Sequence, residues 1–109
     1  MPWEHAPNGV IGLEWAAAVV NTYVDLDQEA FFDRLSVAPA RIGQVKDQGL
    51  VPAIGGPANL TVFDPKREWT PAASLSKAQN SPYLGLPLRG KPMVTVHRGV
   101  VTAVDGAIA

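Results

Sequence analysis

Few side chains in this sequence could carry out chemistry on their own. The 109 residues include no cysteine and only two histidines, His5 and His97. The lack of cysteine excludes a disulfide framework and thiolate zinc sites, and two histidines far apart in the chain do not favour a self-contained histidine site. We expect His5 to be a solvated loop residue and His97 to be a surface or half-buried strand residue rather than a ligand.

The acidic and hydroxyl side chains also have structural explanations. Asp25, Asp27 and Glu29 cluster where a helix is expected to begin, and negative charge there is favoured by the helix dipole. Catalysis by paired carboxylates is not needed to explain them. Ser74 and Ser76 have no neighbouring histidine in the sequence to activate them, so a serine nucleophile is not supported.

The composition indicates one globular domain. Hydrophobic residues make up 47% of the chain and charged residues 17%, and the net charge is −1 from 9 basic and 10 acidic residues. This balance gives no electrostatic footprint for nucleic acid or for an anionic membrane surface. The longest apolar run, residues 15–20, is too short to span a membrane, so we expect a cytoplasmic protein.

The first part of the sequence predicts helices after an initial loop at residues 1–12. Residues 13–24 have a helical apolar stripe and three alanines, which favour helix by propensity. A second helix is expected at residues 28–37, with Asp25 or Asp27 as its N-cap, and its Phe31, Phe32 and Leu35 should pack against the first helix. A short helix at residues 39–42, closed by Gly43, follows.

The second part predicts strands. Residues 59–63 form a short β-rich run that Asp64-Pro65 should stop, and residues 66–77 are expected to be mostly irregular, with Trp69 packed. Residues 91–97 and 100–104 alternate around Arg98-Gly99, which is typical of a β-hairpin. Residues 107–109 should form a frayed tail. The fold class is therefore α+β, with exposed sheet edges and wide apolar helix faces that indicate a piece of something larger.

Several phrases in this order resemble dihydroorotase of the cyclic amidohydrolase family. They are PNGVIGLE at residues 7–14, APARI at 38–42, GGPANLTVFDP at 55–65, Trp69, SKAQNSPYLG at 76–85 and LRG at 88–90, followed by the hairpin. Each phrase alone is weak, but together they cover nearly the whole chain. The SK…NSPY…G phrase leans toward dihydroorotase among its relatives.

The resemblance implies the helical end of a truncated (β/α)₈ barrel followed by the C-terminal strands of a small β-sandwich domain. Residues 1–46 are expected to be the last loop and closing helices of the barrel, and residues 47–109 the C-terminal half of the sandwich. The family interconverts N-carbamoyl-L-aspartate and dihydroorotate in pyrimidine biosynthesis. Its one or two zinc ions are held by side chains whose positions precede this chain, so we expect no catalytic residue and no cofactor here and zinc in the complete parent enzyme.

The resemblance also implies a substrate-binding pair, Asn8 and Gly9. The phrase Trp3-Glu4-His5-Ala6-Pro7 looks like the family's Asp-His-Ala-Pro-His phrase, but Pro7 would then have to serve two motifs that the family separates by a linker. We therefore align residues 6–9 with the later loop, which contacts substrate in the family. Asn8 departs from the aromatic residue found in many members, and Asn8-Gly9 as a simple turn remains an alternative.

Two other interpretations stay open. A sibling enzyme, dihydropyrimidinase (hydantoinase) or allantoinase, shares the sandwich and the Pro-Tyr…Gly pattern. A non-catalytic subunit or interaction module would belong to a different class. If the chain is a segment of a dihydroorotase, we expect it to be inactive alone. It should pair with the remainder of the barrel or with itself, as a homo-oligomer, and have no nucleic-acid or membrane partner.

Overall fold

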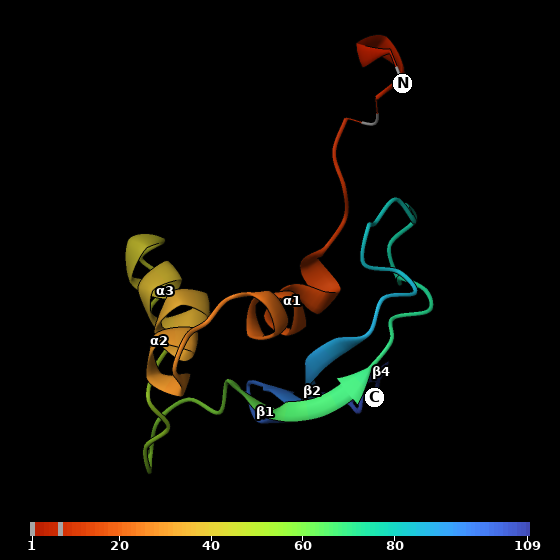
Figure 1. The fold of residues 1–109 in the computed structure, drawn as a ribbon. Coiled ribbons are helices and arrows are strands. Elements are labelled where there is room, and N and C mark those ends of the chain that lie inside the picture. The colour runs from red at the N-terminus through yellow and green to blue at the C-terminus, as the bar shows by residue number, and fades with distance from the viewer. Residues whose placement is uncertain (1, 7) are drawn as a thin grey trace.

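The computed structural model describes residues 2–6 and 8–109, so Met1 and Pro7 of the expected N-terminal loop lie outside the described residues. The elements in chain order are η1 (Trp3–His5), η2 (Leu13–Trp15), α1 (Ala16–Tyr23), α2 (Gln28–Phe32), η3 (Asp33–Val37), α3 (Ala38–Ile42), β1 (Leu60–Trp69), β2 (Leu88–His97), β3 (Val100–Val104) and β4 (Ala107–Ile108). Figure 1 shows the N-terminal segment extending away from the helices and the sheet, and the molecule measures 55 × 28 × 28 Å.

The helices lie close to their expected positions. The expected helix at 13–24 is a single 3₁₀ turn, η2, that runs into α1, and the chain becomes extended at Val24. Asp27, not Asp25, caps α2, since its carboxylate accepts a hydrogen bond from the Ala30 N–H at 2.7 Å. The following residues, 33–37, form a π-helical segment in which the Ala38 N–H donates to the Asp33 carbonyl, five residues back. This wider turn accommodates Pro39, which has no N–H to donate, before α3 ends at Gly43.

The packing of α2 differs from the expectation. Phe31 is buried, but its ring stacks on Phe63 of β1, with ring centroids 5.1 Å apart, and not on α1. Phe32 and Leu35 are 46% and 37% exposed. The second helix therefore contacts the first strand through Phe31, and the expected packing of Phe32 and Leu35 against the first helix is wrong.

The sheet has four antiparallel strands in the order β1-β2-β3-β4. The predicted hairpin is confirmed: His97 pairs with Val100, and Arg98 and Gly99 take φ values of 50° and 79°, as a two-residue type I′ turn requires. The expected frayed tail at 107–109 is wrong, since β4 pairs with β3 and the Ala109 N–H donates to the Thr102 carbonyl at 2.9 Å. β2 also begins at Leu88, three residues earlier than expected.

Strand β1 is longer than predicted. Asp64-Pro65 does not stop it, and the expected irregular segment at 66–77 is strand as far as Trp69. Asp64 pairs with Lys91 and Glu68 with Arg89, so two extra residues of β1 bulge outward between these pairs. Pro65 lies in that bulge, where its missing N–H breaks no ladder bond, and the Asp64 carboxylate accepts from the Lys66 N–H at 3.0 Å.

The core lies where α1 crosses β2. Trp15, Ala18 and Leu88 are almost fully buried there, and Ile11, Trp69, Tyr83 and Leu84 pack around them, among others. Two polar side chains of α1 fix the crossing. The Asn21 amide donates to the carbonyls of Arg89 at 2.7 Å and Pro65 at 2.9 Å, and the Thr22 hydroxyl accepts from the Arg89 N–H at 2.8 Å.

No helix among the described residues has the length and apolar character needed to cross a bilayer.

Candidate functional site

Asn8 and Gly9 lie on a segment that we call the arm, residues 8–12, which connects η1 to η2. Both residues are exposed. Gly9 has a φ of 145°, a conformation that residues with a side chain rarely adopt, and a Cβ built on it would meet no atom within 4 Å. Gly9 is therefore required by its backbone conformation and not by crowding, and the backbone beside it is open to a ligand.

Asn80 holds the arm from across the molecule. Its side-chain amide donates to the Gly9 carbonyl at 2.5 Å, and its own carbonyl accepts from the Ile11 N–H at 2.8 Å. Gly9 and Asn80 are 71 positions apart in the sequence. The structure thus brings together two of the phrases on which the family resemblance depends, the one at residues 7–14 and the one at 76–85.

Glu14 makes a second connection, between the phrase at residues 7–14 and residues 74–76. Its carboxylate accepts hydrogen bonds from the Ser74 hydroxyl, from the Leu75 N–H at 2.8 Å and from the Ser76 N–H at 3.3 Å. The Ser74 hydroxyl therefore donates a hydrogen bond to a carboxylate that organises a turn, and this contact has a structural role. Sequence reasoning missed Glu14 and Asn80 as partners of the arm, although both stand inside the quoted phrases.

The segment that carries Asn80 is itself braced. We call residues 74–80 the clamp loop. The Gln79 side chain donates to the carbonyls of Ser74 at 3.1 Å and Ser76 at 2.9 Å, and it accepts from the Ser74 N–H at 3.1 Å. Figure 1 shows the loop between β1 and β2 rising beside the base of the arm. Just beyond the clamp loop, Tyr83 packs against the core, so the arm is connected to the rigid part of the fold.

The other sequence-predicted candidates are not brought together. Glu4 and His5 lie in η1 and are exposed, and His97 is exposed at the end of β2. Within residues 2–6 and 8–109, no three histidine, aspartate or glutamate side chains gather as a group that could hold a metal ion. We assign no metal-dependent step to these residues.

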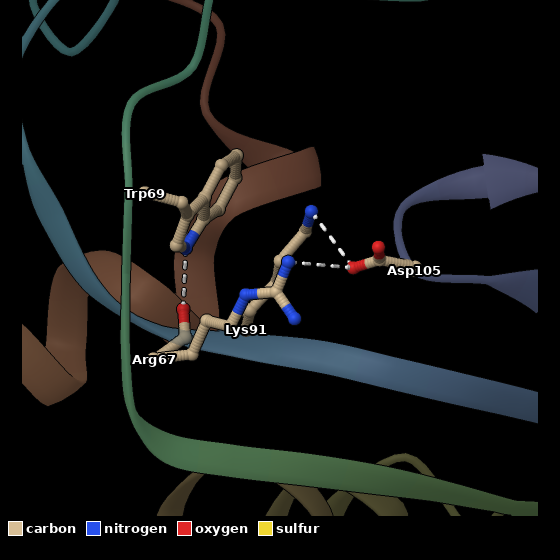
Figure 2. Close-up of polar contacts among 5 residues, drawn as sticks. Arg67, Trp69, Lys91 and Asp105 are labelled. Atoms are coloured by element: carbon tan, nitrogen blue, oxygen red, sulfur yellow. Dashed lines mark hydrogen bonds and ion pairs between the residues drawn. The ribbon is translucent and has the colours of Figure 1, made fainter.

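One charged cluster, which the sequence did not suggest, fastens the β3–β4 turn to the rest of the sheet. Figure 2 shows Lys91 between the Trp69 indole and the Asp105 carboxylate, with Arg67 on the same carboxylate. The Lys91 Nζ is 3.1 Å and the Arg67 guanidinium 3.5 Å from the Asp105 oxygen, and Lys91 also lies 5.3 Å from the Trp69 ring centroid. The hydrogen bond from Lys91 and the charge of Arg67 lower the pKa of Asp105. The cluster therefore stabilises the turn.

Comparisons with known proteins give a consistent assignment. No protein-family model matches the chain. Dihydroorotase of Streptomyces coelicolor is 41% identical over 112 residues, which cover 97% of this chain and 26% of that enzyme. Dihydroorotase of Leifsonia xyli is 39% identical with the same coverage, and that of Mycobacterium tuberculosis is 38% identical over 92% of this chain and 25% of its own length. The chain thus spans about a quarter of the length of the curated relatives that it matches.

The solved structures with a similar fold include hydantoinases. D-hydantoinase (dihydropyrimidinase) from Thermus sp. superposes with a TM-score of 0.81 at 26% identity, over 98% of this chain and 25% of that one. L-hydantoinase (dihydropyrimidinase) from Arthrobacter aurescens gives a TM-score of 0.78 at 28% identity, over 95% and 24%.

Shared sequence, shared fold and the joined motif phrases together show that the chain belongs to the cyclic amidohydrolases. Within this family it corresponds to a C-terminal segment of a dihydroorotase, which confirms the resemblance seen in the sequence. The α+β class is confirmed as well, with its helices in the first part of the chain and its antiparallel sheet in the second.

Proposed function

We propose that this chain is the part of a dihydroorotase-type enzyme that closes the barrel and forms one wall of its substrate pocket. Residues 1–46 provide the last loop and closing helices of the (β/α)₈ barrel, and residues 47–109 provide the C-terminal half of the β-sandwich. The complete cytoplasmic enzyme interconverts N-carbamoyl-L-aspartate and dihydroorotate for pyrimidine biosynthesis. Zinc and the general base are supplied by polypeptide outside this chain, so the chain alone is inactive.

The observation that supports this proposal most strongly is the fixed, open backbone at Gly9. Its N–H can donate to a carbonyl oxygen of a planar ring, and the absence of a Cβ allows the ring to approach closely. The Asn8 amide adds a second donor and acceptor beside it. These residues bind and orient the cyclic amide, while bond making and breaking take place on groups elsewhere in the pocket.

Hydantoinase activity is the second candidate, because the structural neighbours reported above are hydantoinases. Sequence identity of 38–41% to the three dihydroorotases named above, against 26–28% to these two hydantoinases, favours the first candidate. The two activities differ in their substrates, since dihydroorotate carries a carboxylate that dihydrouracil and hydantoin lack.

A chimaera tests the assignment. In it, this chain replaces the matching last quarter of S. coelicolor dihydroorotase, and the unmodified enzyme and its barrel part alone serve as controls. We expect the chimaera to hydrolyse dihydroorotate in preference to dihydrouracil, and the isolated chain to turn over neither. A chimaera that prefers dihydrouracil would assign the chain to the hydantoinases. Stoichiometric zinc binding and turnover by the isolated chain, or a folded chimaera without activity, would contradict the proposal.

The partner of this chain is, on the same proposal, the remainder of the barrel or a second copy. Apolar side chains on the sheet and the helices are exposed, among them Val62, Val101, Val104, Ile108 and Ile42. Such surfaces favour association in water. Light scattering coupled to gel filtration should therefore give the mass of a homodimer or a larger homo-oligomer for the isolated chain, and a stable, well-ordered monomer would argue against the missing partner.

A further inference from the structure

We propose that Asn80 is a positioning residue that sets the substrate-binding backbone at Asn8 and Gly9. The inference rests on the proposed function above. It goes further by giving a role to a residue outside the arm, one that touches the arm but not the substrate.

The two hydrogen bonds of Asn80 fix the arm on both sides of Val10. The side-chain amide of Asn80 donates to the Gly9 carbonyl, and the main-chain carbonyl of Asn80 accepts from the Ile11 N–H. Among the described residues, these are the hydrogen bonds that join residues 8–11 to the remainder of the chain. The Gly9 carbonyl belongs to the Gly9–Val10 peptide plane, so the bond from Asn80 fixes that plane and the position of the Gly9 Cα. The Asn8–Gly9 peptide is attached to this Cα, so a fixed Cα limits the positions that the Gly9 N–H can take.

Asn80 can act as a fixed point because its own surroundings are ordered. The Gln79 side chain closes the clamp loop on itself through Ser74 and Ser76. Glu14 then ties the far end of that loop to the helical segment that follows the arm. One end of the clamp loop therefore holds the arm and the other holds η2, and the Asn80 side chain is the contact to Gly9 itself.

Asparagine at position 80 supplies a hydrogen-bond donor that an ionised aspartate lacks. The amide nitrogen donates to the Gly9 carbonyl, whereas a carboxylate of the same shape would place a second acceptor against that oxygen. Asn80→Asp should therefore disturb the arm more than Asn80→Ala, even though aspartate conserves the volume. That order separates loss of the hydrogen bond from loss of packing.

The position of the arm can be measured directly in the 109-residue chain. NMR-detected hydrogen exchange should show a protected Ile11 amide in the unmodified chain and exchange about fivefold faster in Asn80→Ala, the factor that the loss of one ordinary hydrogen bond produces. Asn80→Asp should exchange faster still. Lys77→Ala is the matched control, since Lys77 is exposed in the same loop and lies outside these hydrogen bonds.

Kinetics of the chimaera test the consequence for substrate. For Asn80→Ala we expect KM for dihydroorotate to rise about fivefold with kcat little changed, because binding is weakened and the reacting groups are elsewhere. Asn80→Asp should raise KM further, and Lys77→Ala should leave it unchanged. Unchanged Ile11 exchange and unchanged KM in both Asn80 variants would overturn the inference, and so would an equal effect of Lys77→Ala. An inactive chimaera carrying the unmodified chain would instead count against the proposed function, and the exchange experiment would still decide whether Asn80 holds the arm.

Discussion

Gly90 on β2 is tightly enclosed by its neighbours, and Gly90→Ala should destabilise the chain strongly. A Cβ built at Gly90 would lie 2.6 Å from Cζ of Phe63 and 2.7 Å from the Asn21 amide nitrogen. Both distances are shorter than carbon and nitrogen atoms tolerate. The neighbouring groups cannot simply move away, because Phe63 is stacked on Phe31 and the Asn21 amide is shared between the Pro65 and Arg89 carbonyls.

The size of the effect follows from these contacts. Gly90 has a φ of 107°, which costs a residue with a side chain about 1–2 kcal/mol. Displacement of the Asn21 amide loses two hydrogen bonds of about 1 kcal/mol each. We therefore expect Gly90→Ala to lower the free energy of unfolding by about 3–4 kcal/mol, which for a domain of this size corresponds to a melting temperature at least about 12 °C lower.

Urea unfolding followed by tryptophan fluorescence, at one fixed protein concentration, measures this loss. Gly99→Ala is the matched control: Gly99 also has a positive φ, 79°, but a Cβ there meets nothing within 4 Å, so it should cost only the backbone term of about 1–2 kcal/mol. The double variant Asn21→Ala with Gly90→Ala should cost less than the sum of the single changes, since one side of the clash is gone. If Gly90→Ala and Gly99→Ala cost the same, the close packing of α1, β1 and β2 is not what limits this position.

Two further perturbations test other contacts. The pKa of Asp105 is lowered first by the hydrogen bond from Lys91 and then by the charge of Arg67. The ionised Asp105 carboxylate therefore stabilises the folded state above the unfolded-state pKa of about 4, and this stabilisation is lost as the pH falls through the lower folded-state pKa. Asp105→Asn should therefore lower the urea midpoint slightly at neutral pH and reduce its fall on acidification, and about 1 M salt should remove the difference. Phe31→Ala should cost about 3–4 kcal/mol because Phe31 is buried, whereas Phe32→Ala, at an exposed position, should cost less than about 1 kcal/mol; equal costs would contradict the assigned packing.

The elements that sequence reasoning predicted correctly depend on short-range patterns. The helix near 13–24 follows from an apolar period and alanine propensity, and the β2–β3 hairpin follows from alternation around Arg98-Gly99. Both signals lie within a few residues of the element that they define. This is why tertiary contacts changed their ends but not their existence.

The wrong predictions concern features that only pairing with a distant segment determines. Asp64-Pro65 has the composition of a strand end, but β2 supplies a partner on which the two residues can bulge, so β1 continues to Trp69. Ala107–Ile108 is too short to show any alternation, and only its ladder with β3 makes it a strand. Phe31 was correctly expected to be buried, yet its partner Phe63 could not be chosen over α1 without knowing where the sheet lies.

The candidate site shows the same limit and also explains why the family phrases are informative. Glu14 and Ser74 are 60 positions apart and Gly9 and Asn80 are 71 apart, so no periodic pattern connects them. The sequence does contain the residue types that these bonds need. Glu14 supplies a carboxylate that accepts from the N–H groups of a turn, and Asn80 supplies a side-chain donor together with a main-chain carbonyl that accepts. A phrase such as SKAQNSPYLG has neither helical nor strand periodicity, because its order comes from the Gln79 side chain and from bonds to Glu14 and the arm. Such bonds leave no periodic pattern in a sequence.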